Sequence, residues 1–303
     1  MSTALELRGV TFCALKHADG TETLGLVLPE GIVDLRAAAA NGTAAPLTLD
    51  AALQGGDRKA LMRLVDACRN STAPRLDPEQ VNYGRLFRHP GKIIGIGLNY
   101  RKHAREIGMD EPQNPPVFSK YDNALLAHRG AITLPPPDVA SHFDYETELL
   151  IVIGRHARNV AVDDALDYVA GYCTANDFSA RDLQIGSPGG QWVLSKTFDG
   201  FAPIGPWFVS ADQIENPNEL QLQTWVNGEL RQSSSTADFI FNVQQIIAYL
   251  TRHWPLEPGD IIFTGTPEGV IQGKPPEQRV WLRPGDRIES DIAGLGRLQF
   301  SLQ

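Results

Sequence analysis

Two glutamates, Glu146 and Glu148, stand one residue apart where the sequence turns into the apolar run 149–154. Side chains alternate along a strand, so residues i and i+2 point to the same side and the two carboxylates are predicted to converge. Like charges that close, beside a buried strand, are costly unless a cation neutralises them. An all-oxygen site favours Mg²⁺, Mn²⁺ or Ca²⁺ over zinc. From this motif alone, an exposed glutamate pair on an edge strand is the alternative interpretation.

Composition argues against polyanionic partners. The net charge is −9, the isoelectric point is near 5.3 and no block of Lys and Arg stands out, so neither nucleic acid nor a membrane surface is an expected partner. The three cysteines, Cys13, Cys68 and Cys173, have no CxxC spacing and are typical of reduced intracellular thiols. The first residues lack a signal-peptide layout, and no apolar stretch approaches the roughly 18 residues of a membrane helix. We therefore expect a cytoplasmic protein.

The pattern of apolar residues divides the chain near residue 85. Before this point the sequence predicts strands, then helices, at 10–15, 22–28, 31–35, 49–53 and 58–68. After it, short strands outnumber helices, and the one long late helix is expected over 240–252. The sequence therefore predicts a small N-terminal α/β domain over 1–85 and a β-rich α+β domain over 86–303.

Three further positions carry groups suited to chemistry beside the glutamates. Asp177 ends an expected strand over 172–177, where its carboxylate is either a third oxygen ligand or a helix N-cap. Lys196 is either a positive charge that neutralises an enolate or carboxylate, or an ordinary surface lysine. Thr266 lies in the turn 263–269. Its hydroxyl and the backbone N–H groups of the turn either hold a substrate carboxylate or simply close a tight turn.

His103 and Glu106 are three residues apart on a helix expected to run from an N-cap at Asn99 to Ile107, so they share a face. Such a pair can orient a water molecule and accept its proton, whereas a purely structural histidine is the alternative. The nearby Gly95-Ile-Gly97 segment lacks the third glycine of a dinucleotide fingerprint, so a nucleotide-binding fold is not expected.

A series of motifs in this chain resembles, in the same order, the motifs of the fumarylacetoacetate hydrolase family across residues 86–303. The matching segments are 97–106, 116–120, 144–148, 176–184, 196–206, 226–229, 258–267 and 284–286. Each segment is short and unspecific by itself, and their shared order is what carries the resemblance. The family resemblance implies a mixed β-roll fold, assembly as a homodimer, and Mg²⁺ or Mn²⁺ at the site.

The resemblance also assigns roles to individual positions. It implies that the metal ligands are Glu146, Glu148 and Asp177. It implies that the catalytic residues are His103, Glu106 and Lys196. It implies that the substrate-binding residues are Tyr100, Lys120, Arg181, Gln184, Gly265 and Thr266.

The activity implied by the resemblance is metal-dependent hydrolysis of a C–C bond in a 2,4-dioxo acid of the acylpyruvate type, through a metal-stabilised enolate, in the catabolism of aromatic or related compounds. The alternatives on the same site are decarboxylation or isomerisation of unsaturated 2-oxo diacids, and decarboxylation of oxaloacetate. A non-catalytic binding protein is a third alternative. Ile96 stands where eukaryotic fumarylacetoacetases carry a further aspartate ligand, so fumarylacetoacetate itself is not an expected substrate.

Overall fold

The computed structural model describes residues 7–39, 44–187 and 189–303. The larger sheet in these residues is mixed and has nine strands, which are, in spatial order, β3 (Gly31–Asp34), β2 (Glu22–Leu28), β1 (Thr11–Lys16), β13 (Phe208–Ser210), β10 (Val169–Asn176), β9 (Thr147–Ile153), β16 (Ile261–Phe263), β4 (Ile93–Ile96) and β5 (Val117–Ser119). The second sheet is also mixed and consists of β15 (Glu229–Ser235), β14 (Gln221–Val226), β17 (Arg287–Ile292), β18 (Gly296–Leu302) and β7 (Gly130–Ile132). Two short pairs complete the strands: β8 (Phe143–Asp144) with β11 (Ser179–Ala180), and β6 (Leu125–Leu126) with β12 (Ala202–Pro203).

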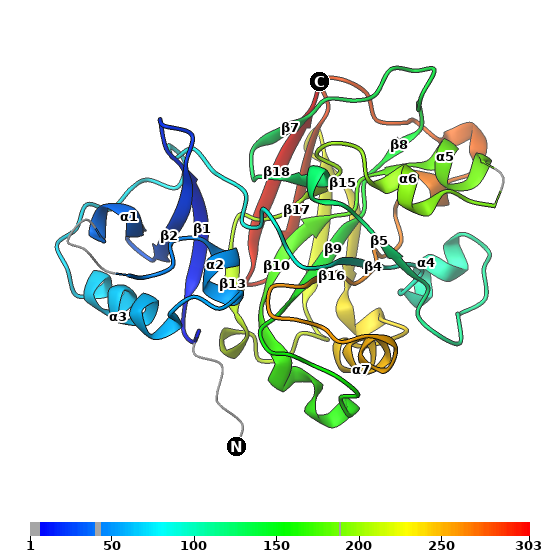
Figure 1. Ribbon diagram of the computed structural model, residues 1–303. Helices are drawn as coiled ribbons and strands as arrows, with labels where there is room; N and C mark the ends of the chain where they lie inside the picture. The colour runs from blue at the N-terminus through cyan, green and yellow to red at the C-terminus, as the bar shows by residue number, and fades with distance from the viewer. Residues whose placement is uncertain (1–6, 40–43, 188) are drawn as a thin grey trace.

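Helices surround the sheets and do not alternate regularly with strands, which confirms the predicted α+β class (Figure 1). The α-helices are α1 (Leu35–Ala38), α2 (Leu49–Leu53), α3 (Arg58–Arg69), α4 (Arg101–Glu106), α5 (Arg181–Gly186), α6 (Trp192–Lys196) and α7 (Val243–His253). In the part of the chain that the structure describes, none of these helices combines the length and apolarity that crossing a membrane requires.

The apolar run after Glu148 forms β9 at the centre of the larger sheet, and every residue of β9 is buried. Alternate side chains enter two different cores: Leu150 and Val152 lie in one, Leu149 and Ile151 in the other. Burial on both faces explains why the strand is continuously apolar and does not alternate with polar residues. Helix α7 covers the second of these cores with one apolar face.

The N-terminal strands continue the larger sheet. Strand β1 pairs antiparallel with β13, with Phe12 opposite Phe208. A single apolar cluster contains residues of both segments, from Leu7 to Phe263. Figure 1 shows β1, β2 and α1–α3 together on one side of the molecule. The domain boundary at residue 85 stays a prediction.

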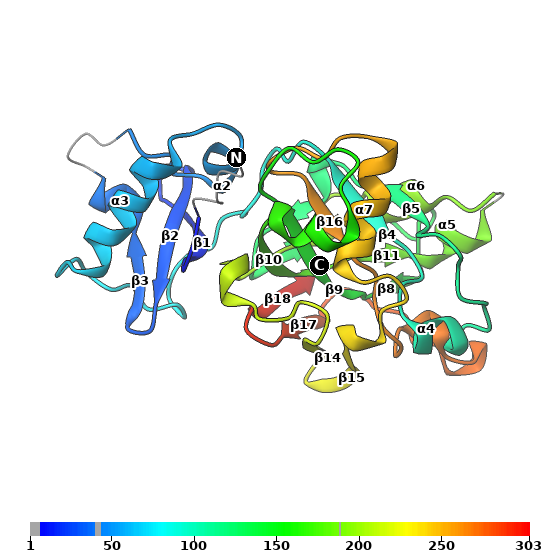
Figure 2. The same ribbon diagram turned by 90° about the horizontal axis from the view of Figure 1, so that it is seen from below.

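The three short helices α4, α5 and α6 gather at the end of the molecule opposite the N-terminal strands in both views (Figure 2). Helix α4 begins differently from the prediction, because its N-cap is Tyr100 and not Asn99. The Asn99 side-chain amide is buried and donates to the Thr264 carbonyl at 2.8 Å. That long-range contact, which the local sequence does not reveal, holds Asn99 away from the capping position.

Candidate active site

Three buried carboxylates meet at one end of the central strands. One oxygen each from Glu146, Glu148 and Asp177 lies within 4.8 Å of the other two. Glu146 lies between β8 and β9, Glu148 lies on β9, and Asp177 directly follows β10. The antiparallel pairing of β9 with β10 sets Ala175 opposite Glu148, which brings the end of β10 to the two glutamates. The structure therefore brings together the three predicted metal ligands.

Lys196 and Arg181 surround Glu146 with positive charge. Lys196 Nζ donates to Glu146 Oε2 and Asp177 Oδ2, at 2.5 Å each, and to Ser179 Oγ at 2.8 Å. Arg181 donates to Glu146 Oε1 at 2.6 Å. Burial alone would raise the pKa of Glu146, but Arg181 and Lys196 hold it well below its ordinary value. Glu146 is therefore kept as a carboxylate in the interior.

Glu148 has the opposite environment. Its carboxylate accepts a hydrogen bond from the Gly265 N–H at 2.7 Å, and within the described residues no cationic side chain forms an ion pair with it. Burial, together with the neighbouring charges of Asp177 and Glu146, raises the pKa of Glu148 well above its ordinary value. A divalent cation among the three carboxylates would relieve this repulsion, and the all-oxygen donor set suits Mg²⁺ or Mn²⁺.

Lys120 is a third buried cation beside the carboxylates, and it contacts Asp177. Its Nζ donates to Asp177 Oδ1 at 2.5 Å and to the Phe201 carbonyl at 3.0 Å. Burial is the main reason that the pKa of Lys120 is lowered, with the Asp177 charge opposing the effect.

His103 and Glu106 form the predicted pair on α4. His103 Nδ1 lies 3.1 Å from Glu106 Oε2, and the Gly269 N–H donates to Glu106 Oε1 at 2.9 Å. Glu106 is thereby fixed from two directions, and the Nε2 atom of His103 is left as the nitrogen that can exchange a proton with a ligand.

His103 and the three carboxylates line one cavity of about 300 Å³, and Glu106 contacts His103. Its polar and charged lining comprises His103, Glu146, Glu148, Asp177, Arg181, Gln184, Lys196, Thr266 and Gln272. Its apolar lining comprises Ile96, Leu98, Ile107, Met109, Pro116, Phe118, Ile185 and Trp192, with Gly97 and Gly265 completing the wall.

Two predicted substrate-binding residues, Tyr100 and Lys120, are not among the residues that line this cavity. Tyr100 is fully buried and packs edge-on against Phe239, with ring centroids 4.8 Å apart. Lys120 contacts the Asp177 carboxylate and lines a neighbouring groove of about 1190 Å³ instead.

Asp144 belongs to the site although the sequence reasoning did not select it. Its carboxylate is buried and accepts from Arg181 Nε at 2.9 Å. It also accepts from the backbone N–H groups of Ile271 and Gln272. Asp144 thus holds Arg181 and the segment that carries Gln272 in place. In the sequence, Asp144 stands two residues before Glu146 and opens the segment 144–148 that resembles the family.

Comparison with known proteins identifies the family. The family model described as fumarylacetoacetate (FAA) hydrolase C-terminal matches residues 92–303. The chain belongs to the fumarylacetoacetate hydrolase family. Among related proteins, it is 41% identical over 286 residues to the fumarylacetoacetate hydrolase domain-containing protein 2 homolog of Dictyostelium discoideum, a match that covers 92% of each chain.

Other members of the family differ in the reactions for which they are named. The chain is 38% identical to a mitochondrial oxaloacetate tautomerase of Bos taurus, with 88% of this chain and 82% of the relative covered. It superposes with a TM-score of 0.76 and 28% identity on maleylpyruvate hydrolase of Sphingobium sp. SYK-6 in complex with manganese(II) and pyruvate, covering 97% and 98% of the two chains. The family is therefore established, and its members include hydrolases, isomerases and tautomerases.

Proposed function

We propose that this protein is a Mg²⁺- or Mn²⁺-dependent enzyme that hydrolyses a C–C bond in a 2,4-dioxo acid of the acylpyruvate type. The observation that carries the proposal is that His103, which is paired with Glu106, lines the same cavity as the buried carboxylates Glu146, Glu148 and Asp177. A divalent cation bound by those carboxylates would supply Lewis acidity toward a 2-oxo acid.

Four side chains of the site have separate roles in the reaction. Lys196 and Arg181 neutralise Glu146 and place positive charge where negative charge develops on the substrate. His103 Nε2 accepts a proton from water, and Glu106 orients the ring through Nδ1 and stabilises the imidazolium that results. The oxygen of that water bonds to C4 of the substrate and the C3–C4 bond breaks. The electron pair of the broken C3–C4 bond remains on C3 of the pyruvate fragment, and C3 takes up a proton. The products are pyruvate and a carboxylic acid.

A second candidate is an isomerase or tautomerase, which moves a proton on a 2-oxo diacid such as oxaloacetate without adding water. Similarity to the bovine oxaloacetate tautomerase favours this candidate. The same His103 Nε2 would then carry the proton between carbon and oxygen. A decarboxylase on the same site stays a further alternative.

The test is turnover of a panel of acylpyruvates, fumarylpyruvate, oxaloacetate and an unsaturated 2-oxo diacid, with Mn²⁺ and with EDTA. The proposal predicts Mn²⁺-dependent formation of pyruvate and one further acid, identified by mass spectrometry. Carbon dioxide release would contradict hydrolysis and indicate a decarboxylase. Enol–keto interconversion without bond cleavage would contradict it and indicate an isomerase or tautomerase. The homodimer and the cytoplasmic location remain predictions, which light scattering and cell fractionation would test.

A further inference from the structure

We infer that the outer part of the cavity is a subsite for an uncharged, apolar acyl group, so that the substrate is a 2-oxo monoacid with an apolar tail and not a 2-oxo diacid. The inference rests on the proposed function, in which the 2-oxo acid end of the substrate lies against Glu146, Glu148 and Asp177. The tail must then extend away from those carboxylates, toward the mouth.

Many of the side chains that line the cavity are apolar. Among them are Ile107 and Met109, which directly follow α4, and Ile185 of α5. Met109 and Ile185 are 56% and 59% exposed, although large apolar side chains are usually buried. A tail bound between them would remove apolar surface from water on both sides.

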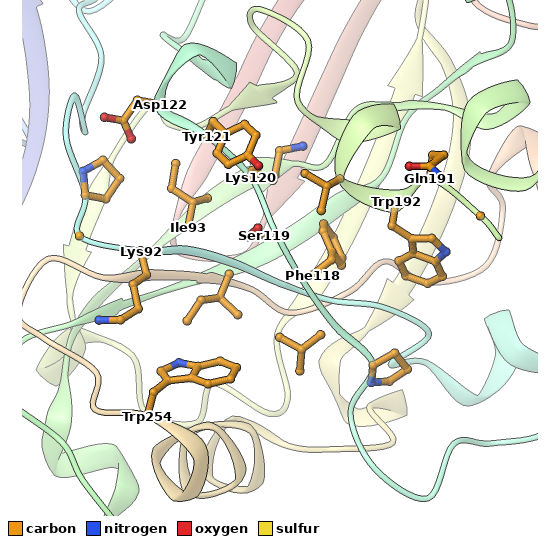
Figure 3. Close-up of a pocket in the computed structure, with 17 residues that line it drawn as sticks. Lys92, Ile93, Phe118, Ser119, Lys120, Tyr121, Asp122, Gln191, Trp192 and Trp254 are labelled. Carbon is orange, nitrogen blue, oxygen red and sulfur yellow. The ribbon is translucent and has the colours of Figure 1, made fainter. Parts of the chain in front are cut away.

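An aromatic pair, Phe118 and Trp192, forms one wall of the cavity. Their ring centroids are 5.7 Å apart, and both residues also line a larger groove of about 1190 Å³ on the outside (Figure 3). Gly95 and Gly97 on β4 and directly after it provide the space for these rings. A Cβ at Gly95 would overlap the Phe118 ring, and one at Gly97 would overlap Trp192. The Gly-x-Gly segment thus has a role unrelated to nucleotides, since it seats the aromatic wall.

The cationic groups of the cavity are already paired. Arg181 donates to Asp144, Glu146 and the Gln184 side-chain oxygen. Lys196 uses its donors on Glu146, Asp177 and a serine. His103 is paired with Glu106, which adds another negative group on its side. Within the described lining, a second substrate carboxylate would therefore find no unpaired cation, only apolar side chains and the neutral polar side chains of Gln184, Thr266 and Gln272.

The test measures binding of three 2-oxo acids to the full chain by calorimetry in the presence of Mn²⁺: pyruvate, 2-oxohexanoate and 2-oxoadipate. The last two have the same chain length and differ in a terminal methyl against a terminal carboxylate, and neither carries the 4-oxo group that hydrolysis needs. Because burying an unpaired charge is costly, 2-oxohexanoate is expected to bind at least about tenfold more tightly than 2-oxoadipate.

Two variants locate the effect. Trp192→Ala should weaken 2-oxohexanoate binding about tenfold and leave pyruvate binding within about twofold, because pyruvate lacks the tail that the inference places against Trp192. Met109→Arg should shift the ratio of the affinities for 2-oxohexanoate and 2-oxoadipate about threefold or more toward 2-oxoadipate, because the new guanidinium can form an exposed ion pair with the terminal carboxylate. Val280→Arg adds the same charge at a residue that is 80% exposed and outside the cavity lining, and should leave the ratio unchanged.

Equal or tighter binding of 2-oxoadipate by the unmodified protein would overturn the inference while leaving the proposed function intact. An equal loss of pyruvate and 2-oxohexanoate affinity in Trp192→Ala would also overturn it. If none of the three acids bound with Mn²⁺ present, the proposed function itself would fail and the inference with it.

Discussion

At the scale of single residues, replacement of His103 should distinguish metal binding from proton transfer. It contacts Glu106 and the cavity, and it is not one of the three carboxylates grouped as metal ligands. Replacing His103 with Asn should lower kcat for acylpyruvate hydrolysis about 10² to 10⁴-fold, the usual contribution of a general base. Mn²⁺ affinity should change by less than about twofold, measured by calorimetry.

Glu111→Gln offers a matched control for His103→Asn, because Glu111 is exposed on the segment after the same helix and does not line the cavity. Hydrolysis that survived intact in His103→Asn would remove the histidine from the mechanism.

A second histidine, His128, gives the stability of the protein a specific pH dependence. Burial, with Arg129 nearby, lowers its pKa from 6.5 to about 4, and its Nδ1 accepts a hydrogen bond from the Gln299 N–H. The unfolded chain therefore takes up a proton first, so this contribution to stability is complete above pH 6.5 and is lost as the pH falls toward 4. Between pH 7 and pH 5 the loss amounts to about 2 kcal/mol of unfolding free energy.

Urea unfolding at the two pH values tests this prediction. His128→Asn, in which the amide oxygen replaces Nδ1 as acceptor, should reduce the pH-dependent loss by that amount, and the exposed His142→Asn should not. Identical pH dependence in all three proteins would show that His128 is not the group responsible.

At the scale of elements, helix α7 depends on a defined N-terminal cap. Asn242 accepts from the Gln245 N–H, and the Gln245 side chain accepts from the Asn242 N–H, which forms a complete capping box. Asn242→Ala should lower the unfolding free energy by about 1 kcal/mol in urea titration. Asn242→Ser retains an oxygen acceptor, so its unfolding free energy should stay within about 0.3 kcal/mol of that of the unmodified protein. Equal stabilities of the Ala and Ser variants would contradict the capping role.

The elements also show which parts of the site the sequence can predict. Glu146 and Glu148 are predictable because their spacing is local and the following run, buried on both faces, has a clear pattern. Helices α5 and α6 are not predictable, since each has six residues or fewer and no side-chain cap. Their formation depends on packing, yet they carry Gln184 and Lys196 into the site. Contacts such as Arg181 to Asp144 join segments whose proximity only the folded sheet determines.

At the scale of the whole molecule, described residues before and after residue 85 contribute to one of the apolar cores. Phe12 of β1 stacks on Phe208 of β13, with centroids 6.4 Å apart. A fragment of residues 86–303 would expose that face and the edge of β13. We predict a lower urea midpoint than that of the full chain, or no cooperative transition, by circular dichroism. An unchanged midpoint would show that the segment after residue 85 folds without the N-terminal strands.

The central claim is that Glu146, Glu148 and Asp177 form a divalent metal site, and calorimetric titration with Mn²⁺ tests it most directly. The unmodified protein should bind one Mn²⁺ per chain. Glu148→Gln should weaken that binding at least about 100-fold, because it removes a ligand charge. Glu229→Gln, an exposed change of the same kind on β15, should leave it unaltered. Absence of Mn²⁺ binding, or equal affinity in Glu148→Gln, would contradict the account.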